Sequence, residues 1–146
     1  MQRVYSLLVD NNSGVLSRIS GLFTRRGYNI DSITAGVTAD SRFTRITIVS
    51  SGDEIILSQI EKQIAKLEDV IVVKVLKPEE SVYRELILVK IRANAQQRSE
   101  IVSIADIFRA KIVDAERESL VIELTGTQSK LEAFLQLLDG YEILEL

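Results

Sequence analysis

The 146-residue chain contains no cysteine, no histidine and no tryptophan, and it has only one proline. Without cysteine there can be no disulfide, no thiolate metal site and no cysteine nucleophile. Without histidine the chain cannot build a Ser-His-Asp triad, a histidine-ligated zinc or an imidazole base. Carboxylates and lysines could still move protons, but no pair of carboxylates stands at a glycine-rich loop. We therefore expect no catalytic residue, metal site or bound cofactor that depends on cysteine or histidine.

Long apolar runs are also missing, since none approaches the ~18 residues of a membrane span. The first residues enter a strand-like pattern at once, without the apolar segment of a signal peptide. The net charge is −3, and the basic residues are scattered among acidic ones. A stripe of cations that follows a phosphate backbone would look different. We therefore expect a cytoplasmic protein that binds neither nucleic acid nor membranes.

Hydrophobic periodicity divides the first half of the chain into six elements. Strand-like alternation covers 4–9, 28–36, 43–49 and 70–76. Helical spacing begins at Val15 and again after 51–54, and the first helix should end at the glycine of Arg25-Arg26-Gly27. The order is strand, helix, strand, strand, helix, strand, which is the βαββαβ pattern of ferredoxin-like units. Because residues 4–9 are apolar on both faces, we expect both faces of this sheet to be covered.

The same order of elements recurs in the second half. Strands are predicted at 85–93, 111–114, 120–125 and 141–146. One helix should be capped by Ser99 and Glu100, and the other should begin at Thr127. The fold class is therefore α+β, with two tandem βαββαβ ferredoxin-like units. We place the first domain at 1–77, a polar linker around Pro78 at 78–82, and the second domain at 83–146.

The junction between the first strand and the first helix, Asp10-Asn11-Asn12-Ser13-Gly14-Val15-Leu16-Ser17-Arg18, could bind an anion. Asn12 or Ser13 can cap the helix, and Gly14 lets a ligand approach the backbone closely. Its first turn carries no carboxylate, so the N–H groups and the positive end of the helix dipole suit a small carboxylate. The alternative is an ordinary capped turn that binds only water. In the second half Glu100 should fill the equivalent place, so we expect a site in the first half only.

A free amino acid would find complementary groups around this junction. Its carboxylate would take the N–H groups of the Gly14 turn, and its ammonium would take oxygens of Asn11, Asn29 or Asp31. An aliphatic side chain could lie among Val15, Leu16, Ile30 and Ile33. The alternatives are that Asn29 is only a turn residue after the helix, and that Ile30 and Ile33 are only core residues.

Each half is small enough to bury only about 60% of its unfolded surface. A third layer, or pairing with another copy, would cover the apolar second face of the first sheet. We therefore predict a homodimer that joins sheets or helices of the first halves.

Three successive segments closely resemble the start of the small, regulatory subunit of acetohydroxyacid synthase (acetolactate synthase). They are Asn11-x-Ser13-Gly14-Val15-Leu16-Ser17-Arg18, Gly21-Leu22-Phe23-x-x-Arg26-Gly27-Tyr28-Asn29-Ile30 and Ser32-Ile33-Thr34. The likeness continues in the second half through Arg84-Glu85-Leu86-x-Leu88-Val89-Lys90-Ile91 and Thr125-Gly126-Thr127-x-x-Lys130-Leu131-x-Ala133-Phe134.

This resemblance implies an ACT domain followed by a ferredoxin-like domain, with no activity of its own. The family's small subunit associates with a catalytic large subunit that carries thiamine diphosphate, FAD and magnesium. It activates that subunit and confers feedback inhibition by valine or another branched-chain amino acid. Effector sites in the family lie between the ACT domains of a dimer, and Asn11, Gly14 and Asn29 match positions associated with valine.

Two other functions remain open. The chain could be a stand-alone ACT-type amino-acid sensor that regulates a different partner. It could also be a small enzyme that uses carboxylates such as Asp31 or Asp53, although nothing in the spacing of these residues supports that.

Overall fold

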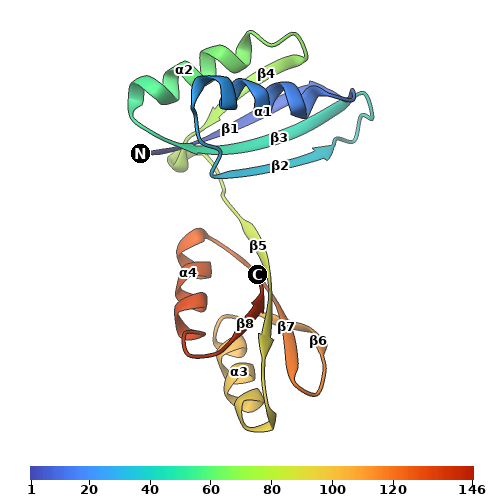
Figure 1. Ribbon diagram of the computed structural model, residues 1–146, viewed down its shortest axis with the longest axis vertical. Helices are drawn as coiled ribbons and strands as arrows, with labels where there is room; N and C mark the ends of the chain where they lie inside the picture. The colour runs from blue at the N-terminus through green and yellow to red at the C-terminus, as the bar shows by residue number, and fades with distance from the viewer. The chain divides into compact units, whose positions relative to one another are not determined.

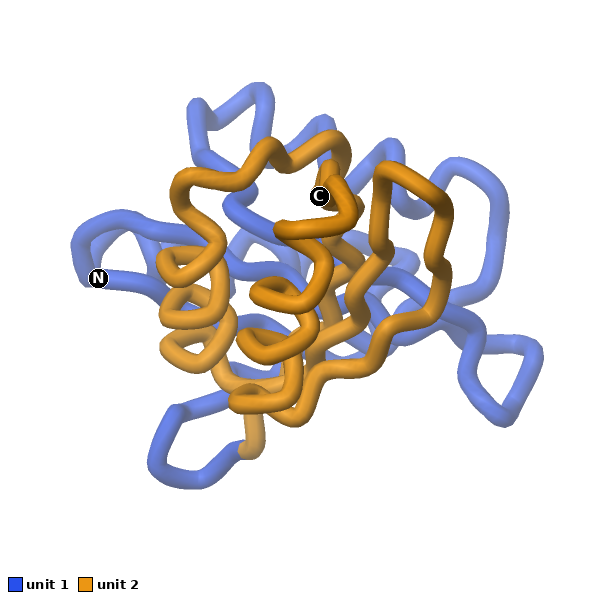
Figure 2. The backbone as a smooth tube through the Cα atoms, turned by 90° about the horizontal axis from the view of Figure 1, so that it is seen from below, with its two compact units in different colours: residues 1–81 blue, residues 82–146 orange.

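The computed structural model describes all 146 residues and divides the chain into two compact units, residues 1–81 and 82–146 (Figure 2). Unit 1 contains six regular elements and a short 3₁₀ helix: β1 (Gln2–Asp10), α1 (Val15–Arg26), β2 (Ser32–Val37), β3 (Phe43–Ser51), α2 (Glu54–Ala65), β4 (Val70–Leu76) and η1 (Pro78–Glu80). Unit 2 repeats the order: β5 (Glu85–Arg92), α3 (Ala95–Ile107), β6 (Lys111–Ala115), β7 (Ser119–Gly126), α4 (Gln128–Leu137) and β8 (Ile143–Glu145). The predicted α+β class with two βαββαβ units is confirmed.

Each unit is built on one antiparallel sheet of four strands. The strand orders are β2-β3-β1-β4 in unit 1 and β6-β7-β5-β8 in unit 2. In both units the first strand is central (Figure 1). The helix that follows it leads to an edge strand, β2 or β6, and the third strand, β3 or β7, lies between that edge strand and the first strand. The edge strands are therefore β2 and β4 in unit 1, and β6 and β8 in unit 2.

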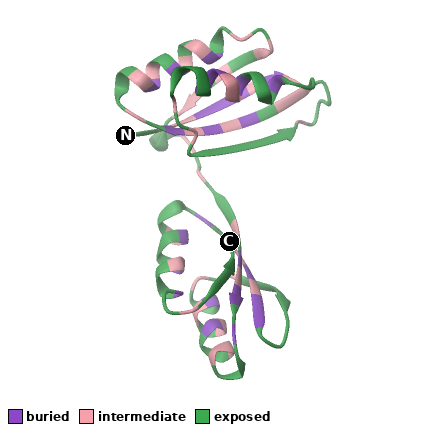
Figure 3. Ribbon diagram, viewed as in Figure 1, coloured by how far each residue is buried: buried purple, intermediate pink, exposed green.

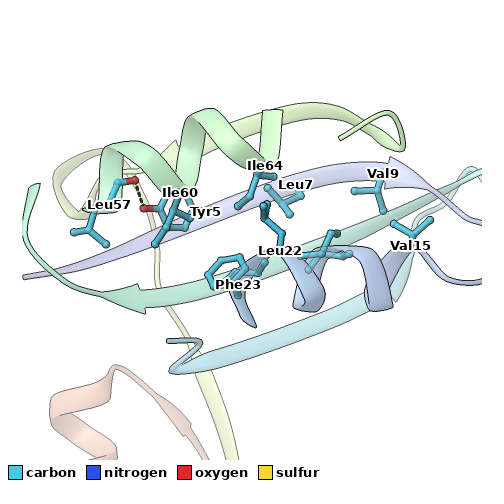
Figure 4. Packing of buried hydrophobic residues seen from close by; sticks show 12 residues of the cluster. Tyr5, Leu7, Val9, Val15, Leu22, Phe23, Leu57, Ile60 and Ile64 are labelled. Atoms are coloured by element: carbon cyan, nitrogen blue, oxygen red, sulfur yellow. Dashed lines mark hydrogen bonds between the residues drawn. The ribbon is translucent and has the colours of Figure 1, made fainter. Parts of the chain in front are cut away.

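In unit 1, α1 and α2 cover one face of the sheet (Figure 1). Alternate residues of β1 point at these helices, and Tyr5, Leu7 and Val9 are at most 1% exposed. The helices contribute the positions that the helical spacing predicted, among them Val15, Ile19, Leu22 and Phe23 of α1 (Figure 4). The other face of the sheet carries no helix of unit 1, and the expected cover of this face by a third layer or by a second copy stays a prediction.

One buried hydrogen bond connects β1 to α2 within the core. The hydroxyl of Tyr5 donates to the carbonyl oxygen of Leu57 in α2 at 2.7 Å (Figure 4). Burial raises the pKa of Tyr5 to about 12, because an ionised phenol would lose both its hydration and its role as a donor. This bond joins the central strand to the second helix.

Because the pKa of Tyr5 is raised in the fold above its ordinary value of 10.0, its contribution to stability is complete below pH 10 and is lost as the pH rises toward 12. We expect Tyr5→Phe to lower the free energy of unfolding at neutral pH by about 1 kcal/mol, the net value of one hydrogen bond. The variant should also lose most of the stability difference between pH 9 and pH 11.5, as measured by urea denaturation. A variant with the same alkaline dependence as the wild-type chain would contradict this assignment.

The ends of α1 differ from one another. At the C-terminal end Gly27 adopts a left-handed conformation (φ 68°), and its N–H donates to the carbonyl of Thr24 at 3.2 Å. This is the predicted glycine cap after two arginines. At the N-terminal end another left-handed glycine, Gly14, precedes the helix, and it has no side chain with which to cap it.

None of the helices is long and apolar enough to cross a membrane.

Candidate functional site

The turn before α1 is the one α-helix start in unit 1 that no side chain caps. Gly14 occupies the position before the helix with φ 86°, a conformation that glycine adopts without strain. The first turn contains no acidic residue, and no side chain accepts a bond from its N–H groups. The prediction that Asn12 or Ser13 caps this helix is wrong, because the chain places Gly14 itself at the capping position. The N–H of Val15 donates to the carbonyl of Asn12 at 3.5 Å, and no side chain accepts from the other donors of the first turn, so an anion could accept from them.

A cation and a carboxylate lie beside this turn. The Nε atom of Arg18 donates to Asp69 Oδ2 at 2.6 Å. Its Nη1 atom lies 3.0 Å from the place that a Cβ on Gly14 would occupy. The turn is thus bordered by a guanidinium from its own helix, and that guanidinium is held by a residue 51 positions away in sequence.

Asn11 is already engaged within the chain. Its Nδ2 donates to the carbonyl of Ser41 at 2.9 Å, and its Oδ1 accepts from the hydroxyl of Thr44 at 3.1 Å. The side chain therefore fixes the β2–β3 turn against the end of β1. Each of its two polar atoms keeps capacity for one further bond.

Asn29 and Asp31 form a second polar group. Asn29 Nδ2 donates to Asp31 Oδ1 at 2.6 Å, and the carbonyl of Asn29 accepts from the hydroxyl of Ser50. The Ser51 hydroxyl donates to Asp31 Oδ2, which together with Asn29 holds the pKa of this carboxyl below its usual range. Asp31 is thus an ionised, exposed carboxylate at neutral pH.

The Gly14 turn and the Asn29–Asp31 group lie at opposite ends of unit 1 (Figure 1). Asn11 follows the end of β1, where Asp10 is opposite Phe43, whereas Asn29 is bonded to Ser50, which is opposite Arg3. Arg3 and Asp10 are about 24 Å apart along the strand. Within one chain the two groups therefore cannot contact the same amino acid.

The four apolar candidates fall into two classes. Val15 is a core residue, and Ile30 is partly buried against the same core. Leu16 and Ile33 are 48% and 40% exposed, so the interpretation of Ile33 as a core residue is wrong. Only Leu16 and Ile33 present a large free surface to a ligand or a partner.

The equivalent helix start in unit 2 is closed. Asn94 caps α3 by accepting from the N–H groups of Gln96 and Gln97, and the side-chain Oε1 of Gln97 accepts from the backbone N–H of Asn94. The prediction that Ser99 and Glu100 begin this helix is wrong, because α3 starts at Ala95. The spacing of Asn94 and Gln97, three residues apart, was the sequence signal for this capping box. An asymmetry between the units remains, but its cause is a side-chain cap rather than an acidic first turn.

No cluster of three or more acidic side chains in the chain is arranged to hold a metal ion. The ionisable groups near the Gly14 turn are paired or bonded to each other, as Arg18 is with Asp69. The assignment of these groups to an amino-acid site stays a prediction.

Comparison with known proteins identifies two family matches that together span most of the chain. Residues 5–72 match the model of the AHAS small subunit-like ACT domain. Residues 84–146 match the model of the small subunit of acetolactate synthase.

Individual relatives agree with these models. A probable acetolactate synthase small subunit of Methanothermobacter thermautotrophicus is 46% identical over 144 residues, which cover 98% of this chain and 86% of that protein. The acetolactate synthase isozyme 3 small subunit of Escherichia coli is 47% identical over 135 residues, or 92% of this chain and 83% of that protein. The crystal structure of the acetolactate synthase small subunit of Thermotoga maritima superposes with a TM-score of 0.91 at 41% identity, covering 99% of this chain and 91% of that chain.

Proposed function

The chain belongs to the family of acetolactate synthase small subunits, and from this we propose that it binds and activates a catalytic large subunit and makes it sensitive to feedback inhibition by valine. In this role the chain is a non-catalytic regulatory subunit in the cytoplasm, in the biosynthesis of branched-chain amino acids. Thiamine diphosphate, FAD and magnesium belong to the large subunit.

The structural observation that supports a valine site shared by two copies is the separation of the two polar groups of unit 1. The Gly14 turn offers backbone donors, but the carboxylate beside it, Asp69, is paired with Arg18, whereas the Asn29–Asp31 group offers an ionised carboxylate that has no cationic partner. The two lie at opposite ends of the same unit. A second copy in antiparallel orientation would bring its Asn29 and Asp31 to the Gly14 turn of the first, and twofold symmetry would create two such sites.

The edge strand β2 is suited to this pairing. All six of its residues are exposed, none is charged or proline, and its register with β3 has no bulge (Figure 3). The edge strand β6 of unit 2 differs, because it carries Lys111 and Asp114 and a register shift between Ile112 and Asp114. Charges and bulges are the features by which proteins prevent edge strands from pairing. Unit 1 therefore offers the edge for a homodimer.

Pairing through β2 would also bury apolar surface. Ile33, Ala35 and Val37 alternate with polar residues and lie on the helix side of the sheet, where Ile33 and Val37 remain 40% and 60% exposed. Leu16 at the start of α1 is 48% exposed. These side chains would cover the aliphatic part of valine between the two copies.

The expected affinity fits a metabolite sensor. Burying a branched aliphatic side chain contributes roughly 1.5–3 kcal/mol, and each charge-assisted hydrogen bond contributes about the same. After the cost of association, a dissociation constant between about 1 μM and 1 mM results. Valine would inhibit if it favoured a dimer arrangement that holds the catalytic subunit in a less active state, since a ligand shifts only an equilibrium whose states it binds differently.

The test combines the purified chain with the catalytic large subunit of its own organism and measures acetolactate formation with and without valine. We expect no activity from the chain alone, a higher rate from the mixture than from the large subunit alone, and a lower rate when valine is added. Binding of valine without any effect on the large subunit would instead support a stand-alone sensor. A mixture whose rate equals that of the large subunit alone would contradict the proposed role.

A further inference from the structure

The face of the unit 1 sheet that points away from α1 and α2, which we call the open face, has a distinctive arrangement of side chains. Its members follow from register, because residues opposite each other on antiparallel strands point to the same side. Starting from the residues of β1 that alternate with the buried Tyr5, Leu7 and Val9, the open face comprises Gln2, Val4, Ser6, Leu8, Asp10, Ser32, Thr34, Gly36, Phe43, Arg45, Thr47, Val49, Ser51, Val72, Lys74 and Leu76.

The centre of the open face is polar and positively charged. Thr34, Thr47, Ser6 and Lys74 form one row across all four strands. Arg45 lies in the next row, and its Nη1 donates to the hydroxyl of Ser6 at 3.2 Å. The residues opposite Arg45 are Leu8 and Gly36, and the carboxylate of Asp10, which is in the following row of the same face, forms no ion pair with it. Neither Arg45 nor Lys74 takes part in an ion pair.

Apolar residues flank the polar row of the open face on both sides. On one side Val4, Val49 and Leu76 are neighbours, and all three are partly exposed. On the other side, in the row of Arg45, Leu8 is beside Val72, which is 47% exposed. Burying unpaired cations against an apolar surface would cost free energy, because the cations would have no partner.

The corresponding face of unit 2 has balanced charges. Lys111 is opposite Glu123, and Lys90 is opposite Glu145. Each cation there has a carboxylate on the neighbouring strand, so that face needs no external charge. The open face of unit 1 thus differs in charge, although the two sheets have the same topology.

We propose that the open face of unit 1 is the surface that binds the catalytic subunit, through a patch of that subunit with carboxylates at its centre and apolar residues around them. A second copy of this chain does not fit, because twofold contact of two open faces would bring Arg45 and Lys74 toward the same cations of the partner. An acidic patch would instead pair with both cations and accept from the hydroxyl groups of Thr34 and Thr47. The inference rests on the proposed function, since it assigns a surface to the partner named there.

The experiment reverses the charge of the open face in the full-length chain and measures its binding to the catalytic subunit. Arg45→Glu with Lys74→Glu is the test variant, and Arg45→Gln with Lys74→Gln removes the charges without adding repulsion. Lys90→Glu, on the balanced face of unit 2, is the matched control. Association is measured by the concentration of regulatory chain that gives half-maximal activation, at two salt concentrations. Thermal melts and valine titration establish that each variant folds.

We expect the charge-reversed variant to need at least about ten times more protein for half-maximal activation, and the neutral variant to fall between it and the wild-type chain. The control should match the wild-type chain, and added salt should weaken wild-type association more than that of the neutral variant. Equal half-maximal concentrations for the wild-type chain and the neutral variant would overturn the assignment of this surface alone. If the variants without the catalytic subunit formed smaller oligomers than the wild-type chain, the assignment would also be overturned, because the open face would then be a contact between copies of this chain. A wild-type chain that does not associate would instead refute the proposed function, and the surface assignment with it.

Discussion

Replacing Gly14 with aspartate is expected to abolish valine binding and inhibition while the activation of the catalytic subunit is retained. The new carboxylate would lie at the uncapped start of α1, where it would interact with the free N–H groups and with the Arg18 guanidinium, whose Nη1 is 3.0 Å from the position that a Cβ would take. Valine would then meet a negative charge at the place where its own carboxylate binds. Loss of a charged contact together with repulsion should weaken binding by more than about 100-fold, as measured by calorimetry.

Gly14→Asn is the matched control for this change. It has nearly the same shape as aspartate and the same cost of about 1–2 kcal/mol for a left-handed backbone at φ 86°, but it carries no charge. We expect the asparagine variant to bind valine more tightly than the aspartate variant. An equal loss of valine affinity in both variants would mean that the added side-chain volume, and not its charge, prevents binding. Wild-type valine sensitivity in Gly14→Asp would refute the assigned pocket.

The second large effect concerns the edge strand β2. Ala35→Lys places a cation at the middle of a strand whose six residues are uncharged and exposed. In a twofold pair of β2 strands the two lysines would lie close together, and an edge lysine is a feature that prevents strand pairing. We expect the variant to sediment as a monomer at micromolar concentration and to lose valine binding with the dimer.

A lysine on the edge strand of unit 2 provides the comparison. Val113→Lys adds a cation to β6, which already carries charged residues and a register shift. This variant should keep the mass and the valine affinity of the wild-type chain. A dimeric Ala35→Lys variant that still binds valine would show that β2 is not the dimer edge.

Much of the fold was predictable because it depends on short-range patterns. Val15, Ile19, Leu22 and Phe23 recur at helical spacing, and all four are buried in the core of unit 1. The glycine after Arg25 and Arg26 ends α1 as predicted, because a left-handed cap needs only one residue without a side chain.

The helix starts were less predictable, since several residues compete for one capping position. Asn12 and Ser13 are good capping residues, yet the chain places Gly14 there and leaves the first turn uncapped. In unit 2 Asn94 caps α3, and the apparent start at Ser99 lies within the helix. A helix can begin at any of several adjacent polar residues, and tertiary contacts determine which one.

The contacts of the candidate site could not be predicted from local sequence at all. Asn11 bonds to Ser41 and Thr44, and Arg18 bonds to Asp69, each across 30 or more positions. The separation of Gly14 from Asn29 likewise depends on the register of the whole sheet. The grouping of these residues into one amino-acid site stays a prediction, and the structure allows it only between two copies.

The most direct test of this shared site mixes two inactive variants. Gly14→Asp and Asn29→His should each fail to bind valine, because every site in either homodimer has one altered side. In a mixed dimer one site would combine the intact Gly14 of one chain with the intact Asn29 of the other, and random exchange would restore about a quarter of the wild-type sites. Calorimetry of the exchanged mixture should therefore detect valine binding with wild-type affinity at this reduced stoichiometry. A mixture of verified mixed dimers that binds no valine would contradict a site built from two copies.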